Sequence, residues 1–338
     1  MNPKISVIIP AYNAENTIKQ CVQSVLDNTF TNFEIVVVDD GSKDNTAKIV
    51  KDLSSFDNRI RLIQKQNEGV SATRNRGIQE ANAPYIMFLD SDDTYEPTCC
   101  EKANNTIEIE KTDIVMFGYY EKFNKQSKTM LCPITYTLNS QDEIYNELIE
   151  KHYMSGVNGY LGSVGLAVFK KSIIVETGIR FNEKLHHSED KLFLLNYLFC
   201  CNRLAVVNEP LYNYELGDSS VTKKYSPTLE ENHRVYGEEW KKLLTKYGHE
   251  DVVKNSSNGS VSLVFSIVLN EVREGNPKPF SQQIKKVKST SKKYKSSVKS
   301  ATANSRSLKI KKIIASHSSL CIAFFLIRRI QRAMGVYF

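Results

Sequence analysis

The sequence predicts an α/β protein: a mostly parallel sheet with flanking helices, followed by a helical C-terminal extension. In the first 120 residues, short runs rich in valine and isoleucine alternate with stretches of helical periodicity, which is the pattern of right-handed βαβ units. From Ser226 onward the pattern is helical throughout. The 338 residues, 41% hydrophobic and 25% charged, suffice for one large domain with additions or for two domains.

The expected strands of the first part are continuous apolar runs, as in parallel strands that are buried on both faces. We expect them at 5–10, 33–40, 59–64, 84–90 and 113–119, with helices between them at 14–28, 43–53 and 69–82. Further along we expect a strand at 162–171, an amphipathic helix at 188–202, two short strands within 203–215, and helices at 228–247 and 252–274. These elements predict an α/β domain at 1–225, a helical region at 226–280 and a basic, weakly hydrophobic helical tail at 281–338.

Polar residues follow three of the expected strands, at 10–12, 39–42 and 90–93. In a parallel sheet the carboxyl ends of the strands lie at one edge, and ligands bind in the crevice beyond that edge. We therefore expect these three segments to form one site.

Three acids stand within four residues at the end of the fourth strand: Asp90, Asp92 and Asp93. Like charges this close repel, and burying them is costly without a positive partner. Mn²⁺ or Mg²⁺ would supply that charge, since both take oxygen ligands and complete their coordination with water and substrate phosphates. Asp90 and Asp92 are therefore expected to serve a nucleotide-diphosphate site. The alternative is a solvated turn whose acids cap a helix.

Residues near the other strand ends suit a nucleobase and its phosphates. Asp39 and Asp40 could accept hydrogen bonds from a base or ribose, and Tyr12 could stack on a base. The alternatives are simple turn chemistry for the two acids and packing of the ring on a helix for Tyr12. Arg74, near the start of the third helix, is expected to bind an anion, because a helix N-terminus and a guanidinium both attract negative charge. Arg76 is expected to be a surface arginine.

Glu189 and Asp190 open the amphipathic helix of the middle region. The helix dipole favours the ionised form of a carboxylate at this position. An ionised carboxylate within reach of a bound hydroxyl can act as a general base. The alternative is that Ser188, Glu189 and Asp190 only cap the helix.

The tail differs from the rest of the chain in charge. The whole chain has 45 Lys/Arg and 38 Asp/Glu, but 281–338 holds 14 Lys/Arg and no Asp/Glu, so the remainder is net negative. An anionic surface is therefore expected as a partner of the tail only. Lysine and serine without interleaved aromatic rings argue against nucleic acid as that partner.

The apolar run 320–327 is followed by Arg328, Arg329 and Arg332. It is too short to span a bilayer and is typical of an interfacial helix on an anionic membrane. The alternative is a helix that packs on its own protein. Because no signal peptide is visible and the seven cysteines show no CxxC pair, we expect reduced, mostly buried thiols in a cytoplasmic protein, peripherally bound to the inner face of the membrane.

Four ordered motifs resemble one known family. "ISVIIPAYN", "IVVVDDGSKDNT", "NEGVSATRNRG" with "MFLDSDD", and "SED" are similar to those of the family-2 inverting glycosyltransferases of the GT-A fold, of the type that assembles bacterial surface polysaccharides. The resemblance is nearly continuous over 4–113 and patchier to about 225, and it does not cover the tail.

The resemblance implies a binding site for a UDP-sugar. Pro10 and Tyr12 would flank the uracil, and Asp40, with Asp39 beside it, would hydrogen-bond the base. Arg74 would lie near the base or the pyrophosphate.

The resemblance also implies the roles of the remaining acids. Asp90 would hold the ribose or belong to the metal shell, Asp92 would ligate Mn²⁺ or Mg²⁺ directly, and Asp190, with Glu189 beside it, would be the catalytic base. The segment 217–225 corresponds to a loop that often closes on the donor. At 214–217 this chain reads Tyr-Glu-Leu-Gly where the family often has Tyr-Arg-x-His, so a phosphate contact from that position is not expected.

The implied function is transfer of one hexose or N-acetylhexosamine to a glycan or lipid-linked glycan. No Gln-x-x-Arg-Trp motif of processive synthases is present, so one sugar per encounter is expected. The alternatives are a nucleotidyltransferase and a catalytically inactive nucleotide-sugar-binding protein. The first would usually have a Gly-rich basic loop where this chain has "PAYNAENT", and the second would be expected to have lost one of the acid motifs.

Overall fold

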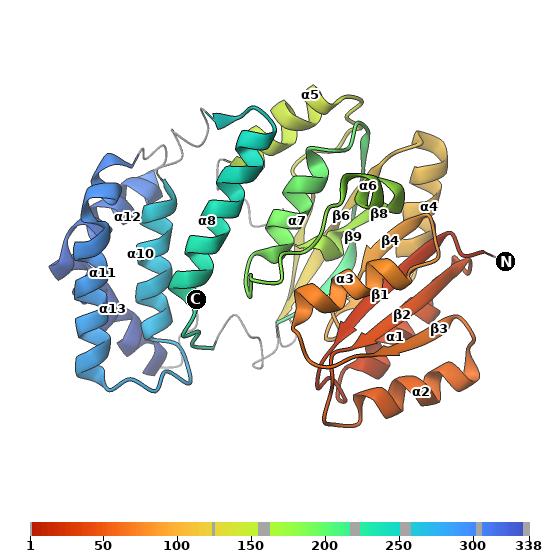
Figure 1. Ribbon diagram of the computed structural model, residues 1–338, viewed down its shortest axis with the longest axis horizontal. Coiled ribbons are helices and arrows are strands. Elements are labelled where there is room, and N and C mark those ends of the chain that lie inside the picture. Colours follow the sequence, from red (N-terminus) through yellow and green to blue (C-terminus); the bar gives the residue numbers. More distant parts are fainter. Residues whose placement is uncertain are drawn as a thin grey trace. The chain divides into compact units, whose positions relative to one another are not determined.

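The fold is taken from a computed structural model, which describes residues 2–123, 126–154, 163–216, 224–250, 258–301 and 306–333. The chain divides into two compact units, Met1–Leu216 and Gly217–Phe338 (Figure 1). The first unit is α/β, and the second is helical within its described residues. The boundaries at 225 and 280 that the sequence predicts between the α/β domain, the helical region and the basic tail stay predictions.

Nine strands form one mixed sheet within the described residues of the first unit. They are β1 Ile5–Ala11, β2 Phe33–Asp39, β3 Ile60–Gln64, β4 Tyr85–Phe88, β5 Thr94–Tyr95, β6 Ile114–Phe123, β7 Gln126–Met130, β8 Ala167–Lys170 and β9 Leu204–Glu215. The order is β3-β2-β1-β4-β8-β6-β9-β5, with β7 beside β6. The first four strands of this order are parallel, as is the pair β6 and β9, whereas β8, β5 and β7 pair antiparallel.

The register of the central strands brings three predicted segments to one edge. β1 and β2 pair from Ile5 with Phe33 to Ala11 with Asp39, and β1 pairs with β4 up to Ile8 with Phe88. The residues that follow β1, β2 and β4 therefore emerge at the same edge of the sheet.

The helices of the first unit connect these strands (Figure 1). They are α1 Ile18–Leu26, α2 Thr46–Phe56, α3 Val70–Glu80, α4 Cys99–Glu110, α5 Gln141–Glu143 with the π-helix η1 Ile144–Met154, the 3₁₀ turn η3 Val164–Leu166, α6 Lys171–Thr177 and α7 Glu189–Leu198. Helix α3 lies very close to β1: a Cβ built at Gly77 would be 2.3 Å from Cγ2 of Ile8. The glycine therefore allows the approach that places α3 at the sheet.

Aromatic rings fix the start of α7 near the end of β4. Phe181, in the segment before α7, stacks on Phe193 of α7 at a centroid distance of 4.0 Å, and Phe88 of β4 meets both rings edge-on at 5.4 and 6.0 Å. Buried aromatic pairs of this kind add to the free energy of burial. This cluster holds the first turn of α7 where the chain after β4 can reach it.

The structure differs from the predicted elements in the middle region. Residues expected as one strand at 162–171 form η3 followed by the short strand β8, and the two strands expected within 203–215 are one strand, β9. Pro210, which lacks a backbone donor, sits opposite Gly118 where the register between β6 and β9 shifts, so the strand continues past the proline. The strands β5 and β7 were not predicted.

Figure 1 shows the described helices of the second unit, and all of them except the first share one apolar core. They are α8 Leu229–Lys246, α10 Asn258–Glu271, α11 Phe280–Ser300, α12 Arg306–Ser316 and α13 Ser318–Ala333. α10 contributes Val264 and Val268, α11 contributes Val287, and α13 contributes Cys321 and Phe325. The apolar run in the tail thus packs in part on its own unit, which was the alternative reading of that run.

None of the described helices is long and apolar enough to cross a bilayer alone. α12 and α13 meet the length and composition criteria only as a pair, and they are bent by 109° at the residue between them.

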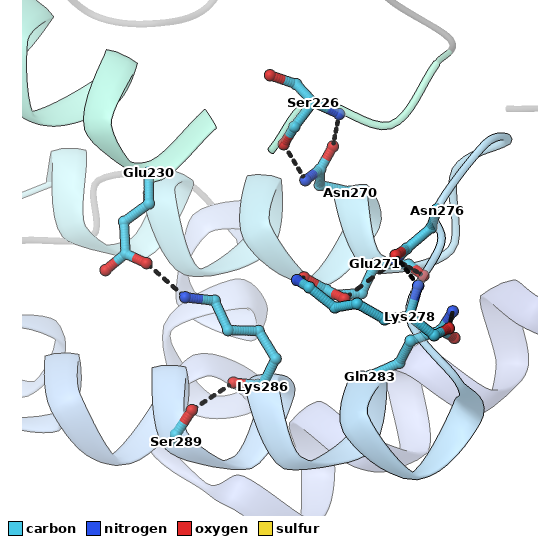
Figure 2. Close-up of polar contacts among 9 residues, drawn as sticks. All are labelled: Ser226, Glu230, Asn270, Glu271, Asn276, Lys278, Gln283, Lys286 and Ser289. Atoms are coloured by element: carbon cyan, nitrogen blue, oxygen red, sulfur yellow. Dashed lines mark hydrogen bonds and ion pairs between the residues drawn. The ribbon is translucent and has the colours of Figure 1, made fainter. Parts of the chain in front are cut away.

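Polar contacts join α8 to α11 in this unit (Figure 2). Glu230, in the first turn of α8, accepts hydrogen bonds from Nζ of Lys286 and of Lys293, both at 2.6 Å, and from the hydroxyl of Tyr294 at 2.7 Å. Burial alone would raise the pKa of Glu230, but these three donors outweigh it and lower the pKa to about 2. The ionised carboxylate is therefore bound more strongly in the folded state than in the unfolded state.

We expect Glu230→Gln to lower the free energy of unfolding at pH 7 by about 1–2 kcal/mol, because partly exposed hydrogen bonds to a charge are lost. The measurement is urea denaturation of the full chain followed by circular dichroism. Since the folded pKa of about 2 lies below the ordinary 4.5, the contribution is complete above pH 4.5 and disappears as the pH falls toward 2. The difference between wild type and variant should therefore shrink at pH 3.

Glu231→Gln is the matched control, because Glu231 occupies the same helical turn but pairs only with the exposed Arg234. Its effect is expected to stay within about 0.5 kcal/mol. Equal effects of the two substitutions would contradict the role given to Glu230.

Candidate active site

Arg74 lies at the centre of a buried charge cluster. It comes from the second turn of α3, and only 4% of its side chain is exposed. Its Nη2 donates to Oδ1 of Asp90 at 2.7 Å, and its Nη1 donates to Oδ1 of Asp190 at 2.6 Å and to Oε1 of Glu189 at 3.0 Å. Arg74 therefore joins three other predicted site residues, Asp90, Glu189 and Asp190.

Burial alone would lower the pKa of Arg74, but the charges of Asp190, Asp90 and Glu189 outweigh it and raise the pKa. The guanidinium therefore stays protonated, and it also lies 5.4 Å from the centroid of the Phe181 ring. Its Nε is buried and has no hydrogen-bond partner among the described residues.

Glu189 and Asp190 reach Arg74 because of the way in which α7 begins. Ser188 precedes the helix in the left-handed conformation, with φ at 67°, and its side chain makes no capping hydrogen bond. The two carboxylates turn inward to Arg74. The alternative that this segment only caps the helix is thus wrong for these side chains.

The acids around Arg74 outnumber the positive charges. Burial raises the pKa of Asp190 to about 8; Arg74 opposes this shift, and the charges of Glu189 and Asp90 add to it. Desolvation by the surrounding protein, followed by the charge of Asp90, raises the pKa of Asp92. The ionised forms of these acids therefore repel one another more than Arg74 alone can offset, and a further cation would relieve that repulsion.

Asp93 is the most buried of the acids that follow β4, with 1% of its surface exposed. It accepts hydrogen bonds from the hydroxyl of Tyr212 at 2.5 Å and from the backbone N–H of Glu215 at 2.8 Å. Burial and the charges of Asp90 and Asp92 raise the pKa of Asp93 to about 8. The sequence analysis missed Tyr212 as a partner of this segment; Asp93 ties the segment after β4 to the end of β9.

Asp90 and Asp92 fit a hard divalent cation by the chemistry of their donor atoms. The side chain of Asp90 is 36% exposed and Asp92 is exposed, so both offer carboxylate oxygens at the surface of this cluster of acids. The described part of the chain holds no group of three or more His, Cys, Asp or Glu residues suited to a metal. Two carboxylates suit Mn²⁺ or Mg²⁺ when water and substrate phosphates complete the coordination.

Asp40 organises the segment that leads into α3. Its Oδ1 accepts from Nζ of Lys65 at 2.6 Å and from the backbone N–H of Glu68 at 3.0 Å, and its Oδ2 accepts from the N–H of Gly69 at 2.8 Å. Asp40 therefore positions the helix that carries Arg74. Sequence reasoning missed Lys65; its place directly after β3 was the available signal.

The turns after β1 and β2 are bound to each other. The backbone N–H of Asn13 donates to Oγ of Ser42 at 2.9 Å, and the N–H of Lys43 donates to Oδ1 of Asn13 at 2.9 Å. Gly41 turns here with φ at 73°, and a Cβ at this position would lie 3.0 Å from the backbone nitrogen of Asn67.

Pro10, Tyr12 and Asp39 lie at this same pair of turns. Pro10 is buried in β1, and Asp39 is buried and accepts from the N–H of Ser42 at 3.2 Å. Tyr12 is 49% exposed, so its ring is accessible to a ligand. Arg76, two residues after Arg74 in α3, pairs at the surface with Glu80 at 2.8 Å. Of the predicted closing loop 217–225, residues 217–223 lie outside the described residues.

Comparison with known proteins agrees with this arrangement. Residues 6–169 match Glycosyl transferase family 2. The Bacillus subtilis (strain 168) proteins EpsH and EpsJ, both described as glycosyltransferases, are 33% and 30% identical to this chain over 232 and 234 residues. These alignments cover 68% and 69% of this chain and 66% and 67% of the relatives, so the chain matches about two thirds of their length.

Solved structures show the same fold. Residues 1–349 of Staphylococcus aureus TarS, in complex with UDP-GlcNAc, align with a TM-score of 0.64 at 18% identity and cover 99% of this chain and 93% of that one. The predicted GT-A fold is confirmed, and the family match favours a glycosyltransferase over the nucleotidyltransferase alternative. The chain belongs to glycosyltransferase family 2.

Proposed function

We propose that this protein transfers one sugar from a UDP-sugar to a hydroxyl of a glycan or lipid-linked glycan, with inversion at the anomeric carbon, in the assembly of a bacterial surface polysaccharide. One observation carries the proposal: Arg74 joins Asp90, at the predicted donor end, to Asp190, the predicted base. The family match and the UDP-GlcNAc complex of a protein with the same fold support a nucleotide-sugar donor.

The donor is proposed to bind at the edge where β1, β2 and β4 end. Tyr12, whose ring is accessible, would stack on the uracil beside Pro10. Asp39 would hydrogen-bond the base, while Asp40 already has three donors from the segment before α3 and would act chiefly by holding that segment. Asp90 would hold the ribose or share the cation with Asp92.

A divalent cation, Mn²⁺ or Mg²⁺, would be held by Asp92 and Asp90 together with the diphosphate. When bound, it would neutralise the negative charge that grows on the UDP leaving group. The excess of carboxylates over cations in this cluster supports its presence.

Asp190 is proposed to remove the proton from the acceptor hydroxyl. The acceptor oxygen then forms a bond to the anomeric carbon on the face opposite UDP, and the bond between that carbon and the phosphate oxygen breaks with its electron pair on UDP. Glu189 shares Nη1 of Arg74 with Asp190 and would keep the base oriented. The arginine balances the charge of the base until the proton arrives.

A lipid-linked acceptor would bring the enzyme to the membrane. The basic composition of 281–338 supports a peripheral position on an anionic inner membrane face.

The proposal is tested by incubating the purified protein with Mn²⁺ and single UDP-sugars and measuring the UDP released. Release with one or a few UDP-hexoses or UDP-N-acetylhexosamines is expected. Asp92→Ala should lower the release at least about 100-fold, since the charge stabilisation by a metal is worth several kcal/mol. Asp52→Ala, at an exposed position of α2, is the control and should leave it unchanged. Binding of a UDP-sugar without any release, with acceptor extract present, would instead support the inactive binding protein.

A further inference from the structure

The second unit carries an apolar groove between three of its helices. The groove has a volume of about 720 Å³, which is within the range of small-molecule sites. Its apolar lining comes from Phe265 and Leu269 of α10, Ile310 and Ile314 of α12, and Phe324 of α13. Such a lining accommodates a hydrocarbon chain.

Two cations line the same groove, Lys311 and Arg328. Nζ of Lys311 lies 6.0 Å from the centroid of the Phe265 ring, and the guanidinium carbon of Arg328 lies 5.2 Å from that of Phe324. Among the described residues, no carboxylate lies within ion-pair distance of Lys311. The groove therefore combines an apolar lining with positive charge, which is the chemistry that complements an anionic amphiphile.

The apolar surface continues from the groove onto exposed faces of α12 and α13. Leu320, Phe324 and Ile327 are spaced at i, i+4 and i+7 and share one face of α13. Phe324 lines the groove, whereas Leu320 and Ile327 are 41% and 53% exposed. On α12, Ile310 lines the groove and is still 51% exposed.

Two of the three arginines after the apolar run are turned toward their own unit, which differs from a simple interfacial helix. Nη1 of Arg329 donates to Oε1 of Gln283 at 2.6 Å, and Arg332 donates to the backbone oxygen of Val272. Positive charge for an anionic partner would come from the groove itself.

We propose that this groove binds one anionic phospholipid of a bilayer surface. An acyl chain would lie against the apolar lining, the phosphate would contact Lys311 and Arg328, and the exposed aliphatic residues of α12 and α13 would enter the interface. This deepens the membrane association in the proposed function and rests on it. A second copy of the chain is a less suitable occupant, because a two-fold interface on this face would bring the cations of both copies together.

The first test uses dioctanoyl-phosphatidylglycerol below its critical micelle concentration, titrated into the full-length protein by calorimetry. We expect one site per chain, at least tenfold weaker binding of dioctanoyl-phosphatidylcholine, and no detectable binding of glycerol phosphate, which lacks the chains. Equal binding of the two lipids would overturn the role of charge, and binding of glycerol phosphate alone would overturn the role of the groove.

Charge reversal at two positions of one helix separates the groove from general electrostatics. Lys311→Glu should weaken binding of the anionic lipid at least tenfold. Lys309→Glu changes the net charge equally at an exposed position of α12 outside the groove lining, and should weaken binding less than threefold. Equal losses would show diffuse attraction and contradict the proposal.

The exposed apolar face of α13 is tested by flotation with vesicles of phosphatidylcholine that contain about 30 mol% phosphatidylglycerol. Anionic lipid at about this level attracts basic protein segments. Ile327→Asp should reduce vesicle binding at least fivefold. Ile109→Asp is the control, at an isoleucine of α4 that is 78% exposed, and it should leave vesicle binding unchanged. Bound protein that resists carbonate extraction would contradict the proposal. An Ile327→Asp variant that loses self-association but keeps lipid binding would contradict it as well.

UDP release from the free donor in solution is measured in parallel for all four variants. It should remain at the wild-type level, because none of the substituted residues belongs to the proposed active site. A wild-type protein that binds the lipid but releases no UDP would count against the proposed function and leave the lipid site standing. Normal UDP release by a protein that does not bind the lipid would count against the lipid site and leave the proposed function standing.

Discussion

Asp190→Asn is expected to lower the turnover number by about 1,000-fold, within the range of general-base contributions, and to change the Kd for UDP by less than about threefold. Asparagine keeps the size of the side chain and an oxygen toward Nη1 of Arg74, which now lies 2.6 Å from the carboxylate. It cannot take up the proton of the acceptor hydroxyl. The turnover is measured as sugar transfer under saturating donor, and UDP binding by calorimetry.

Glu189→Gln is the matched comparison for this prediction. Glu189 bonds the same nitrogen of Arg74 at 3.0 Å and is similarly buried, but the mechanism gives it an orienting role only. Its loss should reduce turnover by about tenfold to a hundredfold, as for supporting residues of other sites. Near-normal turnover in Asp190→Asn together with complete loss in Glu189→Gln would move the base to Glu189.

Arg74→Met should be the most destabilising single change at the site. It leaves Asp90, Glu189 and Asp190 without the buried cation that joins them, and breaking a buried pair in this way costs about 3–5 kcal/mol. Donor turnover should fall below detection, because the carboxylates would protonate or separate. Urea denaturation followed by circular dichroism gives the free energy of unfolding.

Arg76→Met provides the control two residues further along the same helix, on its exposed face. Arg76 is half-exposed and pairs with Glu80 across one helical turn, so its loss should cost less than about 1 kcal/mol. The double variant Arg74→Met/Asp190→Asn should be more stable than Arg74→Met alone, because one uncompensated carboxylate is removed. If it is not, the coupling assigned to Arg74 is wrong.

Much of the fold was predictable because its signals are local. The apolar runs at β1, β2 and β4 and the helical periodicity between them specify a parallel sheet, and the strand ends then place three polar segments at one edge. The middle region was predicted less well: 203–215 was expected to form two strands but forms one, β9, which passes Pro210 at the register shift opposite Gly118. The residues that the register skips, Asn208, Glu209 and Leu211, lie in β9 on either side of Pro210, and only the pairing with β6 shows that they belong to one continuous strand.

The sequence predicted which residues belong to the site, but not which of them pair through hydrogen bonds and ion pairs. Arg74 was expected near the nucleotide, and Asp40 was expected to contact the base. The structure joins Arg74 to Asp190 across 116 positions of the chain and uses Asp40 to bind the segment before α3. Which charges pair depends on where α7 is held by the rings of Phe88, Phe181 and Phe193.

The amino-acid order alone determined the strands β1 to β4 with the helices between them, the edge at which the polar segments gather and the basic character of the tail, since each of these follows from neighbouring residues. Tertiary packing alone decided that one buried guanidinium pairs with acids from two distant segments, and that Arg329 and Arg332 bond to their own unit while Ile327 stays exposed. The physical reason is the same in both cases: a charge takes the nearest partner that the packed core leaves within hydrogen-bond reach.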